Sequence, residues 1–267
     1  MEKVIIEDIV INIFNGIPIH ICLERLKKLF GEKWDDKVNK DSISIRINEI
    51  VNYQTQLEEL IKIPEIEQRS EEWYKTRHNL ITASDFAQAL GKGKFGTVKQ
   101  FYRNKCGYEE NKFNNNLEPL QWGIRYEPVA TMIYEKMSRT TITEFGLIQH
   151  TKHDFIGASP DGINNLGIML EIKCPWRRKK TETIPEQYEY QIQGQLEVCN
   201  LEECDYFECY FKEYDNYEDM VNDGEIYYKG IIFKINNEYK YGHVNDLNYN
   251  VDKYDTVYYY GLKDSYT

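Results

Sequence analysis

A short apolar run that leads directly into charged residues is the feature that most constrains the fold of this chain. Residues 167–170 (Gly-Ile-Met-Leu) continue into Glu171-Ile172-Lys173. Such a run is typical of a buried β-strand, and side chains alternate along a strand, so Glu171 and Lys173 should point to the same side. Charged groups at the end of a buried strand need partners, because an unpaired buried charge is costly. A metal ion is one such partner.

A second carboxylate lies just before this strand, in the turn Ser159-Pro160-Asp161-Gly162. An Asp followed by Glu-x-Lys supplies the hard oxygen ligands that Mg²⁺ prefers, and an ammonium that holds a water nucleophile and offsets charge on phosphorus. The pattern therefore predicts a nuclease centre. Taken singly, the same fragments are also typical of an ordinary turn and of a solvated strand face.

The segment 122–137 is predicted to be a helix with one apolar stripe. The stripe consists of residues at helical spacing: Tyr126, Val129, Ala130, Ile133, Tyr134 and Met137. Proline is tolerated in the first turn of a helix, so Pro128 places Glu127 near the N-terminal end, beside the buried stripe. A glutamate in a first turn is also favoured by the helix dipole alone.

The order of the remaining elements predicts an α/β (α+β) fold in which a small mixed sheet is flanked by helices. We expect strands at 143–149, 155–158, 168–173 and 206–211, a helix at 185–199, and a hairpin of 226–235 and 238–244 that turns at Asn236-Asn237. In the helix at 185–199, Gln191 and Gln195 border the apolar face and should look toward the sheet. The metal site is expected where the second and third strands diverge.

Residues 1–66 are predicted to be a helical N-terminal extension, and residues 67–267 a domain with a strand-rich C-terminal tail. Ser42 is expected to cap a helix that Pro64 ends. Ser70 is expected to cap a short helix that continues through Arg77.

The charge of the chain, with 33 basic and 44 acidic residues and a net charge of −11, is unfavourable for nucleic-acid binding. A nucleic-acid path therefore requires a local concentration of basic residues. One follows the Glu-x-Lys strand: Arg177, Arg178, Lys179 and Lys180. The acidic segment 213–225 should face away from it.

Six cysteines occur in a chain in which we find neither a signal peptide nor an apolar run of about 18 residues. These features predict a soluble, intracellular protein with reduced thiols and no membrane contact. The spacing of Cys199, Cys204 and Cys209 matches no common zinc pattern.

Six blocks occur in one order along the chain. They are Trp73-Tyr74-Lys75-Thr76-Arg77, Ile81-Thr82-Ala83-Ser84, Trp122-Gly123-x-x-Tyr126-Glu127, Ser159-Pro160-Asp161-Gly162, Glu171-Ile172-Lys173-Cys174-Pro175 and Gln191-Ile192-Gln193. Together they closely resemble the lambda-exonuclease family, also called YqaJ-type viral recombinases, of the PD-(D/E)XK nuclease superfamily. The resemblance covers about residues 68–211 and implies a restriction-endonuclease-like core.

The resemblance also implies roles for individual residues. Asp161 and Glu171 look like shared metal ligands, with the carbonyl of Ile172 as a third and Glu127 completing a site for two Mg²⁺ ions, or Mn²⁺ in their place. Lys173 looks like the residue that positions and activates the water, and Gln191 like the glutamine that steadies the arrangement.

Contacts to DNA are implied in the same way. Arg77 and Ser84 look like the pocket for a 5′-terminal phosphate. Leu120 falls where the phage enzyme places an apolar wedge between strand ends.

The implied activity is a Mg²⁺-dependent 5′→3′ exonuclease on duplex DNA ends, in recombination or replication of a virus or mobile element. It would release 5′-mononucleotides and leave a 3′ single strand for an annealing protein; the oligomeric state stays open. One alternative is a structure- or sequence-specific endonuclease on the same core. A CRISPR-associated iron–sulfur nuclease is disfavoured by the cysteine spacing. A non-catalytic DNA-binding partner is disfavoured because Glu127, Asp161, Glu171, Lys173 and Gln191 occur together.

Overall fold

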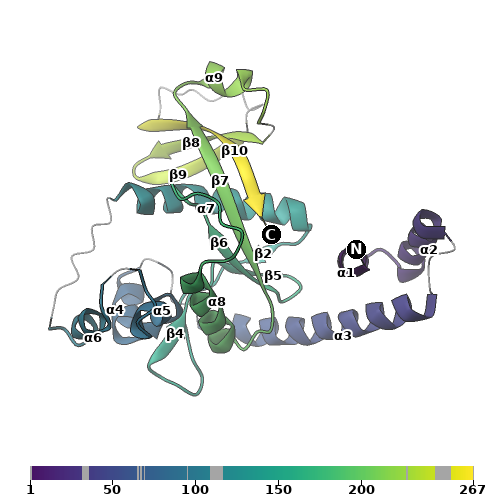
Figure 1. Cartoon of the computed structure of the whole chain (residues 1–267), viewed down its shortest axis with the longest axis horizontal. Coiled ribbons are helices and arrows are strands. Elements are labelled where there is room, and N and C mark those ends of the chain that lie inside the picture. The colour runs from purple at the N-terminus through teal and green to yellow at the C-terminus, as the bar shows by residue number, and fades with distance from the viewer. Residues whose placement is uncertain are drawn as a thin grey trace.

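The computed structural model describes residues 2–31, 36–64, 66, 68, 70–94, 96–108, 117–226, 228–243 and 254–266. Within these ranges the chain has a mixed α/β architecture, with helices packed around a strongly curved sheet (Figure 1). The predicted fold class, a mixed sheet flanked by helices, is confirmed. None of the helices in these ranges has the length and apolar character that a membrane span requires.

The larger sheet has seven strands in the order β2-β5-β6-β7-β10-β8-β9. Their bounds are β2 Ile142–Thr143, β5 Gly162–Asn164, β6 Met169–Lys173, β7 Cys204–Tyr214, β10 Thr256–Tyr266, β8 Lys229–Ile235 and β9 Glu238–His243. Strands β6 and β7 run parallel and are connected through helix α8 (Glu186–Cys199), whereas the other neighbours are antiparallel. The predicted strand at 168–173 is therefore confirmed as β6, in the interior of the sheet.

The smaller sheet pairs β1 (Ile81–Thr82), β4 (Ile156–Ala158) and β3 (Ile148–Gln149) in the order β1-β4-β3. The prediction of one strand at 143–149 is wrong, because this segment divides between β2 of the larger sheet and β3 of the smaller one. Phe145 and Leu147 between them are buried without belonging to either strand, so the apolar run reflects burial and not a continuous ladder. The three-residue strand β5 was not predicted.

The helices, in chain order, are α1 Glu2–Phe14, α2 Ile19–Phe30, α3 Asp36–Ile61, α4 Glu71–Asn79, the 3₁₀ turn η2 Ala83–Asp85, α5 Phe86–Ala89, α6 Val98–Lys105, α7 Glu118–Ser138, α8 and α9 Tyr217–Asn222. Ser70 caps α4 as predicted, since its side chain accepts a hydrogen bond from the amide of Trp73. The prediction that Ser42 caps a helix is wrong, because α3 already begins at Asp36. The hairpin turn at Asn236 and Asn237 is confirmed by their positive φ angles of 50° and 65°.

The N-terminal helices pack on the sheet domain mainly through α3, and Val10 of α1 joins the same contact. Ile50 and Tyr53 bury against Leu166 and Ile168, next to β6, and Leu57 joins the main core. The helical character of this region is confirmed, and the division at residue 66 stays a prediction.

Helix α7 crosses the sheet beside β6 and β7 (Figure 1) and supplies most of the core on that side. Tyr126, Val129, Ile133 and Tyr134 bury as predicted against Leu170, Ile172 and Phe207, whereas Met137 is exposed. The prediction that Pro128 lies in the first turn is wrong, because the helix begins at Glu118. A proline inside a helix costs about 3 kcal/mol. The extra turns bury Trp122 and Arg125, which offsets this cost.

Candidate active site

Strand β6 carries a buried carboxylate and a lysine on the same side, as the alternation of side chains predicts. Glu171 is 0% exposed, and the ammonium of Lys173 forms an ion pair with its Oε1 atom. Burial opposes the positive charge of Lys173. The carboxylates of Glu171 and Asp161 outweigh that effect and raise the pKa of Lys173 above its usual value. Lys173 is therefore an ammonium at neutral pH and acts as a donor and as a positive charge.

The second predicted carboxylate, Asp161, is fixed against the edge of β6 by the backbone. Its Oδ2 atom accepts a hydrogen bond of 2.7 Å from the amide of Ile172. The pKa of Asp161 is raised well above its usual range, first by burial and then by the negative charge of Glu171, while Lys173 opposes the shift. A carboxylate in this position would be stabilised by an additional positive charge nearby.

Glu127 on α7 belongs to the same electrostatic neighbourhood. Its negative charge contributes to the raised pKa values of Asp161 and of the Cys174 thiol, for both of which burial is the largest cause. Glu171 and Asp161 thus act on the ammonium of Lys173, Glu127 acts on Asp161, and the donor atoms of all three carboxylates are oxygen. A hard divalent cation such as Mg²⁺ suits this donor set and its excess negative charge.

Two glutamines of α8 hold the buried carboxylate from the other side. The side-chain amide of Gln191 donates to Oε1 of Glu171 at 2.7 Å, and that of Gln195 donates to Oε2 at 2.8 Å. The sequence predicted that both residues face the sheet, which is confirmed, but it indicated a role for Gln191 alone. The helical spacing of four residues was the available sign that the two side chains act on one group.

The carboxylates do not converge into a ready-made metal site. Within the ranges that the structure describes, no three His, Cys, Asp or Glu side chains lie close enough together to hold a metal ion. The contacts explain this: Glu171 is turned toward Lys173 and the two glutamines, and Asp161 toward the backbone of β6. The residues fit a divalent cation in chemistry and charge.

The predicted phosphate pocket brings Arg77 of α4 and Ser84 of η2 together. The guanidinium donates to the Ser84 hydroxyl at 2.6 Å and lies 4.7 Å from the ring of Trp73. Burial lowers the pKa of Arg77, and the nearby Asp85 only partly opposes this shift. Asp85 itself is bound by Lys105 at 2.9 Å. Arg77 is therefore a partly desolvated cation beside a hydroxyl, a suitable environment for an anion.

The four basic residues of the loop after β6, 177–180, have different partners. Arg178 is bound by the buried Glu208 of β7, whereas the exposed Arg177 lies with its guanidinium 3.9 Å from the ring of Trp176. Lys179 and Lys180 are exposed on the same loop. Leu120, the predicted wedge, lies in the first turn of α7 and is 46% exposed.

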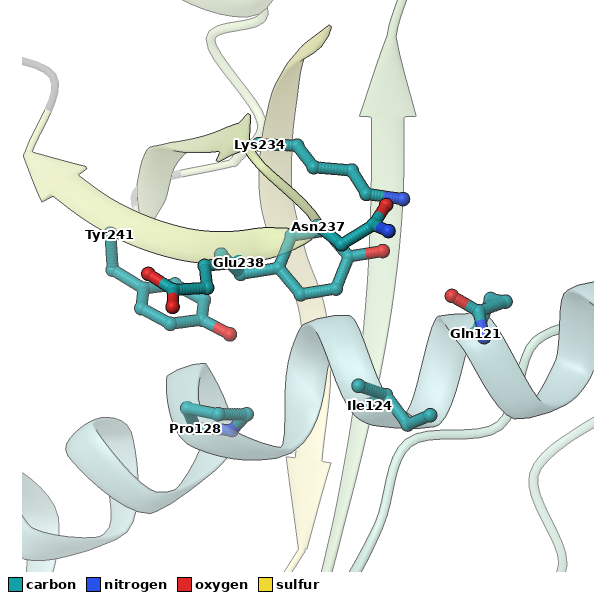
Figure 2. A pocket seen from close by; sticks show the side chains of 8 residues that line it. Gln121, Ile124, Pro128, Lys234, Asn237, Glu238 and Tyr241 are labelled. Carbon is teal, nitrogen blue, oxygen red and sulfur yellow. The ribbon is translucent and has the colours of Figure 1, made fainter. Parts of the chain in front are cut away.

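A separate cavity of about 650 Å³ lies between α7 and the hairpin β8–β9 (Figure 2). It is lined by Gln121, Ile124, Pro128, Lys234, Asn237, Glu238, Tyr239 and Tyr241. None of the predicted site residues lines it, so this cavity is distinct from the carboxylate cluster. Pro128 has no N–H to donate to the carbonyl of Ile124, so the α7 wall of this cavity lacks one helical hydrogen bond.

Residues 72–202 match the family described as the YqaJ-like viral recombinase domain. The chain is 34% identical over 209 residues to the uncharacterized protein R354 of Acanthamoeba polyphaga mimivirus, a match that covers 70% of this chain and 36% of that protein. It is 27% identical over 163 residues to protein D345L of African swine fever virus, covering 49% of this chain and 46% of that protein. The chain therefore spans less than half the length of these viral relatives.

Solved structures are also similar. An alkaline exonuclease, LHK-Exo, from Laribacter hongkongensis is 27% identical in sequence, and the two structures match with a TM-score of 0.47. The match covers 53% of this chain and 74% of that one. Its complex with dAMP is 26% identical, with a TM-score of 0.42, and covers 52% of this chain and 73% of that one.

Proposed function

We propose that this chain, whose residues 72–202 match the YqaJ-like viral recombinase domain, is a metal-dependent nuclease that degrades one strand of linear duplex DNA from its 5′ end. The observation that carries the proposal is the set of contacts that Glu171 makes. It forms an ion pair with Lys173, accepts a hydrogen bond from Gln191 and lies near Asp161. The sequence blocks predicted these four residues as one site. Asp161 lies beside this contact set, and its pKa is raised first by burial and then by the negative charge of Glu171.

The proposed metal ligands are Glu127, Asp161, Glu171 and the carbonyl of Ile172. These groups would hold Mg²⁺, or Mn²⁺ in its place, which would supply Lewis acidity to the phosphate and activate the attacking water. The backbone amide of Ile172 holds Asp161 in place, and Gln191 holds Glu171.

Lys173 is proposed to orient the attacking water and to offset the negative charge that develops on the phosphoryl oxygens. In this role it acts through hydrogen bonds and through its positive charge. Its position is determined by the ion pair with Glu171.

Arg77 and Ser84 are proposed to bind the 5′-terminal phosphate, and Leu120 to separate the strand ends. The exposed Arg177, Lys179 and Lys180 are proposed to contact the backbone of the duplex. Arg178 would contribute to that surface mainly by holding the loop against Glu208. The products would be 5′-mononucleotides and a 3′ single strand on which an annealing protein can act.

The relatives in two viruses support a place for this reaction in viral DNA recombination or replication. We propose that residues 67–267 form the nuclease domain and that residues 1–66 are a helical extension packed on it.

The deciding experiment is a cleavage assay with Mg²⁺ on three substrates of one sequence: linear duplex with 5′-phosphate ends, linear duplex with 5′-hydroxyl ends, and a covalently closed circle. The proposal predicts mononucleotide release from the linear substrates, faster with the phosphate, and an intact circle. Cutting of the circle would instead support the endonuclease alternative. Asp161→Asn, assayed in parallel, should be inactive and excludes a contaminating nuclease.

A further inference from the structure

Gln195 is a buried amide that is directed at the catalytic carboxylate. Its side chain is 1% exposed, lies one turn after Gln191 on α8, and donates from Nε2 to Oε2 of Glu171 at 2.8 Å. Glu171 is itself fully buried, so this hydrogen bond has no competition from solvent. A hydrogen bond to a buried charge restricts the orientation of that charge strongly.

The two oxygens of Glu171 are held unequally. A carboxylate offers about four acceptor positions, two on each oxygen. Oε1 accepts from both Lys173 and Gln191, whereas among the described residues Oε2 accepts from Gln195 alone. Oε1 is thus saturated, and the remaining acceptor position of the carboxylate is on Oε2. A cation that Glu171 binds would therefore be met by the oxygen that Gln195 holds.

Packing alone does not account for an amide at this position. The Oε1 atom of Gln195 is buried and has no hydrogen-bond partner. An unpaired buried acceptor is destabilising, and an apolar side chain of similar length would avoid it. The amide is explained by its Nε2 contact with Glu171 and not by the requirements of the core.

We propose that Gln195 is a positioning residue that fixes the metal-facing oxygen Oε2 of Glu171, while Lys173 and Gln191 fix Oε1. The inference rests on the proposed function, because it assigns a task within the same metal site. It also divides the work of the two glutamines: Gln191 orients the carboxylate with respect to Lys173, and Gln195 orients it with respect to the metal ion.

The test compares Gln195→Met with a matched control, Gln193→Met. Gln193 lies on the same helix but is exposed, and methionine has a length similar to that of glutamine without its donor. Binding of Mn²⁺ to the DNA-free protein is measured from the EPR signal of the unbound ion, and cleavage is measured as a function of Mg²⁺ concentration. Substitution of a residue that hydrogen-bonds to a metal ligand typically lowers metal affinity by about 10- to 100-fold. We expect a loss of that size in Gln195→Met, with cleavage regained at high Mg²⁺, and no change in Gln193→Met.

The result that overturns the inference is unchanged Mn²⁺ affinity and Mg²⁺ dependence in a folded Gln195→Met protein that cleaves DNA like the wild type; the proposed function would then stand without it. A wild-type protein that neither binds Mn²⁺ nor cleaves DNA overturns both. If Gln195→Met does not fold, as judged by thermal unfolding, Gln195→Asn takes its place. It keeps the amide but is too short to reach Oε2, and wild-type metal affinity in this variant would equally refute the inference.

Discussion

Replacing Arg77 by alanine is expected to remove the preference for 5′-phosphorylated DNA ends. The guanidinium is partly desolvated, and burial already lowers its pKa, so the charge is poorly compensated by the chain itself. The nearest acid, Asp85, accepts from Lys105 at 2.9 Å and from the amide of Thr82 at 3.0 Å. Ser84 at 2.6 Å offers only a hydroxyl. A phosphate is the anion that would complete this environment.

The expected magnitude follows from the difference between the two kinds of DNA end. A 5′-phosphate gives Arg77 a charged acceptor that a 5′-hydroxyl lacks, and a hydrogen bond to a charged group contributes about 1.5–3 kcal/mol. That range corresponds to about a 10- to 150-fold preference in the wild-type protein. Arg77→Ala should abolish the preference, chiefly by slowing cleavage of the phosphorylated substrate. Arg77→Lys should retain only part of it, because an ammonium lacks the planar fork of the guanidinium.

The assay is the initial rate of mononucleotide release from 5′-phosphate and 5′-hydroxyl duplexes, measured for each variant at subsaturating DNA. Lys75→Ala is the matched control, since Lys75 is an exposed cation on the same helix, α4. If Arg77→Ala kept the full preference, or if the wild type had none, Arg77 would be a structural arginine and the proposed phosphate pocket would be refuted.

Three further outcomes are expected. Glu171→Gln and Asp161→Asn should abolish cleavage while duplex binding, measured by fluorescence anisotropy in EDTA, changes less than threefold. Glu208→Gln should destabilise the protein by about 1–3 kcal/mol at pH 7. Burial alone would raise the pKa of Glu208, but its hydrogen bonds outweigh burial and lower it. The contribution of this carboxylate to folding stability is therefore complete above its pKa in the unfolded chain, near 4.3, and is lost as the pH falls through its pKa in the folded protein. Urea unfolding at several pH values should show the gap to wild type closing in acid. Arg46→Met should cost about 1–3 kcal/mol, because it leaves the partly exposed Glu203 without its bidentate partner.

Local periodicity was sufficient to predict the centre of the candidate site. Glu171 and Lys173 share a side because strands alternate, and Gln191 and Gln195 share a helix face because they are four residues apart. Strand β6 and helix α8 were both long enough for their side-chain periodicity to be recognised. The hydrogen bonds of the two glutamines to Glu171 join the helix pair to the strand pair. Asp161 was found from its turn sequence, which is also local.

Pairings between distant segments could not be predicted from the sequence. Strand β10 inserts between β7 and β8, so the last strand along the chain separates two strands that precede it. Arg125 inside α7 is 3% exposed and binds Glu213 of β7 at 2.5 Å. From the sequence, Glu213 was predicted only to belong to an acidic segment, 213–225, that faces away from nucleic acid. This ion pair helps to explain why α7 begins ten residues before Pro128, since the helical turns that precede the proline carry Arg125 into the core.

The register between β6 and β7 explains how Lys173 remains committed to Glu171. Parallel pairing places Glu208 directly beside Lys173, so a second buried acid is available to the same ammonium. Glu208 is, however, already occupied: Arg178 and Tyr206 donate to its Oε1 atom, and Tyr210 donates to Oε2 at 2.8 Å. The guanidinium of Arg178 already compensates the negative charge of Glu208, so a second cation gains less there. The basic loop that follows β6 thus does more than offer charge to a ligand, because its Arg178 neutralises the competing acid and the ion pair of Lys173 stays with the carboxylate at the proposed metal site.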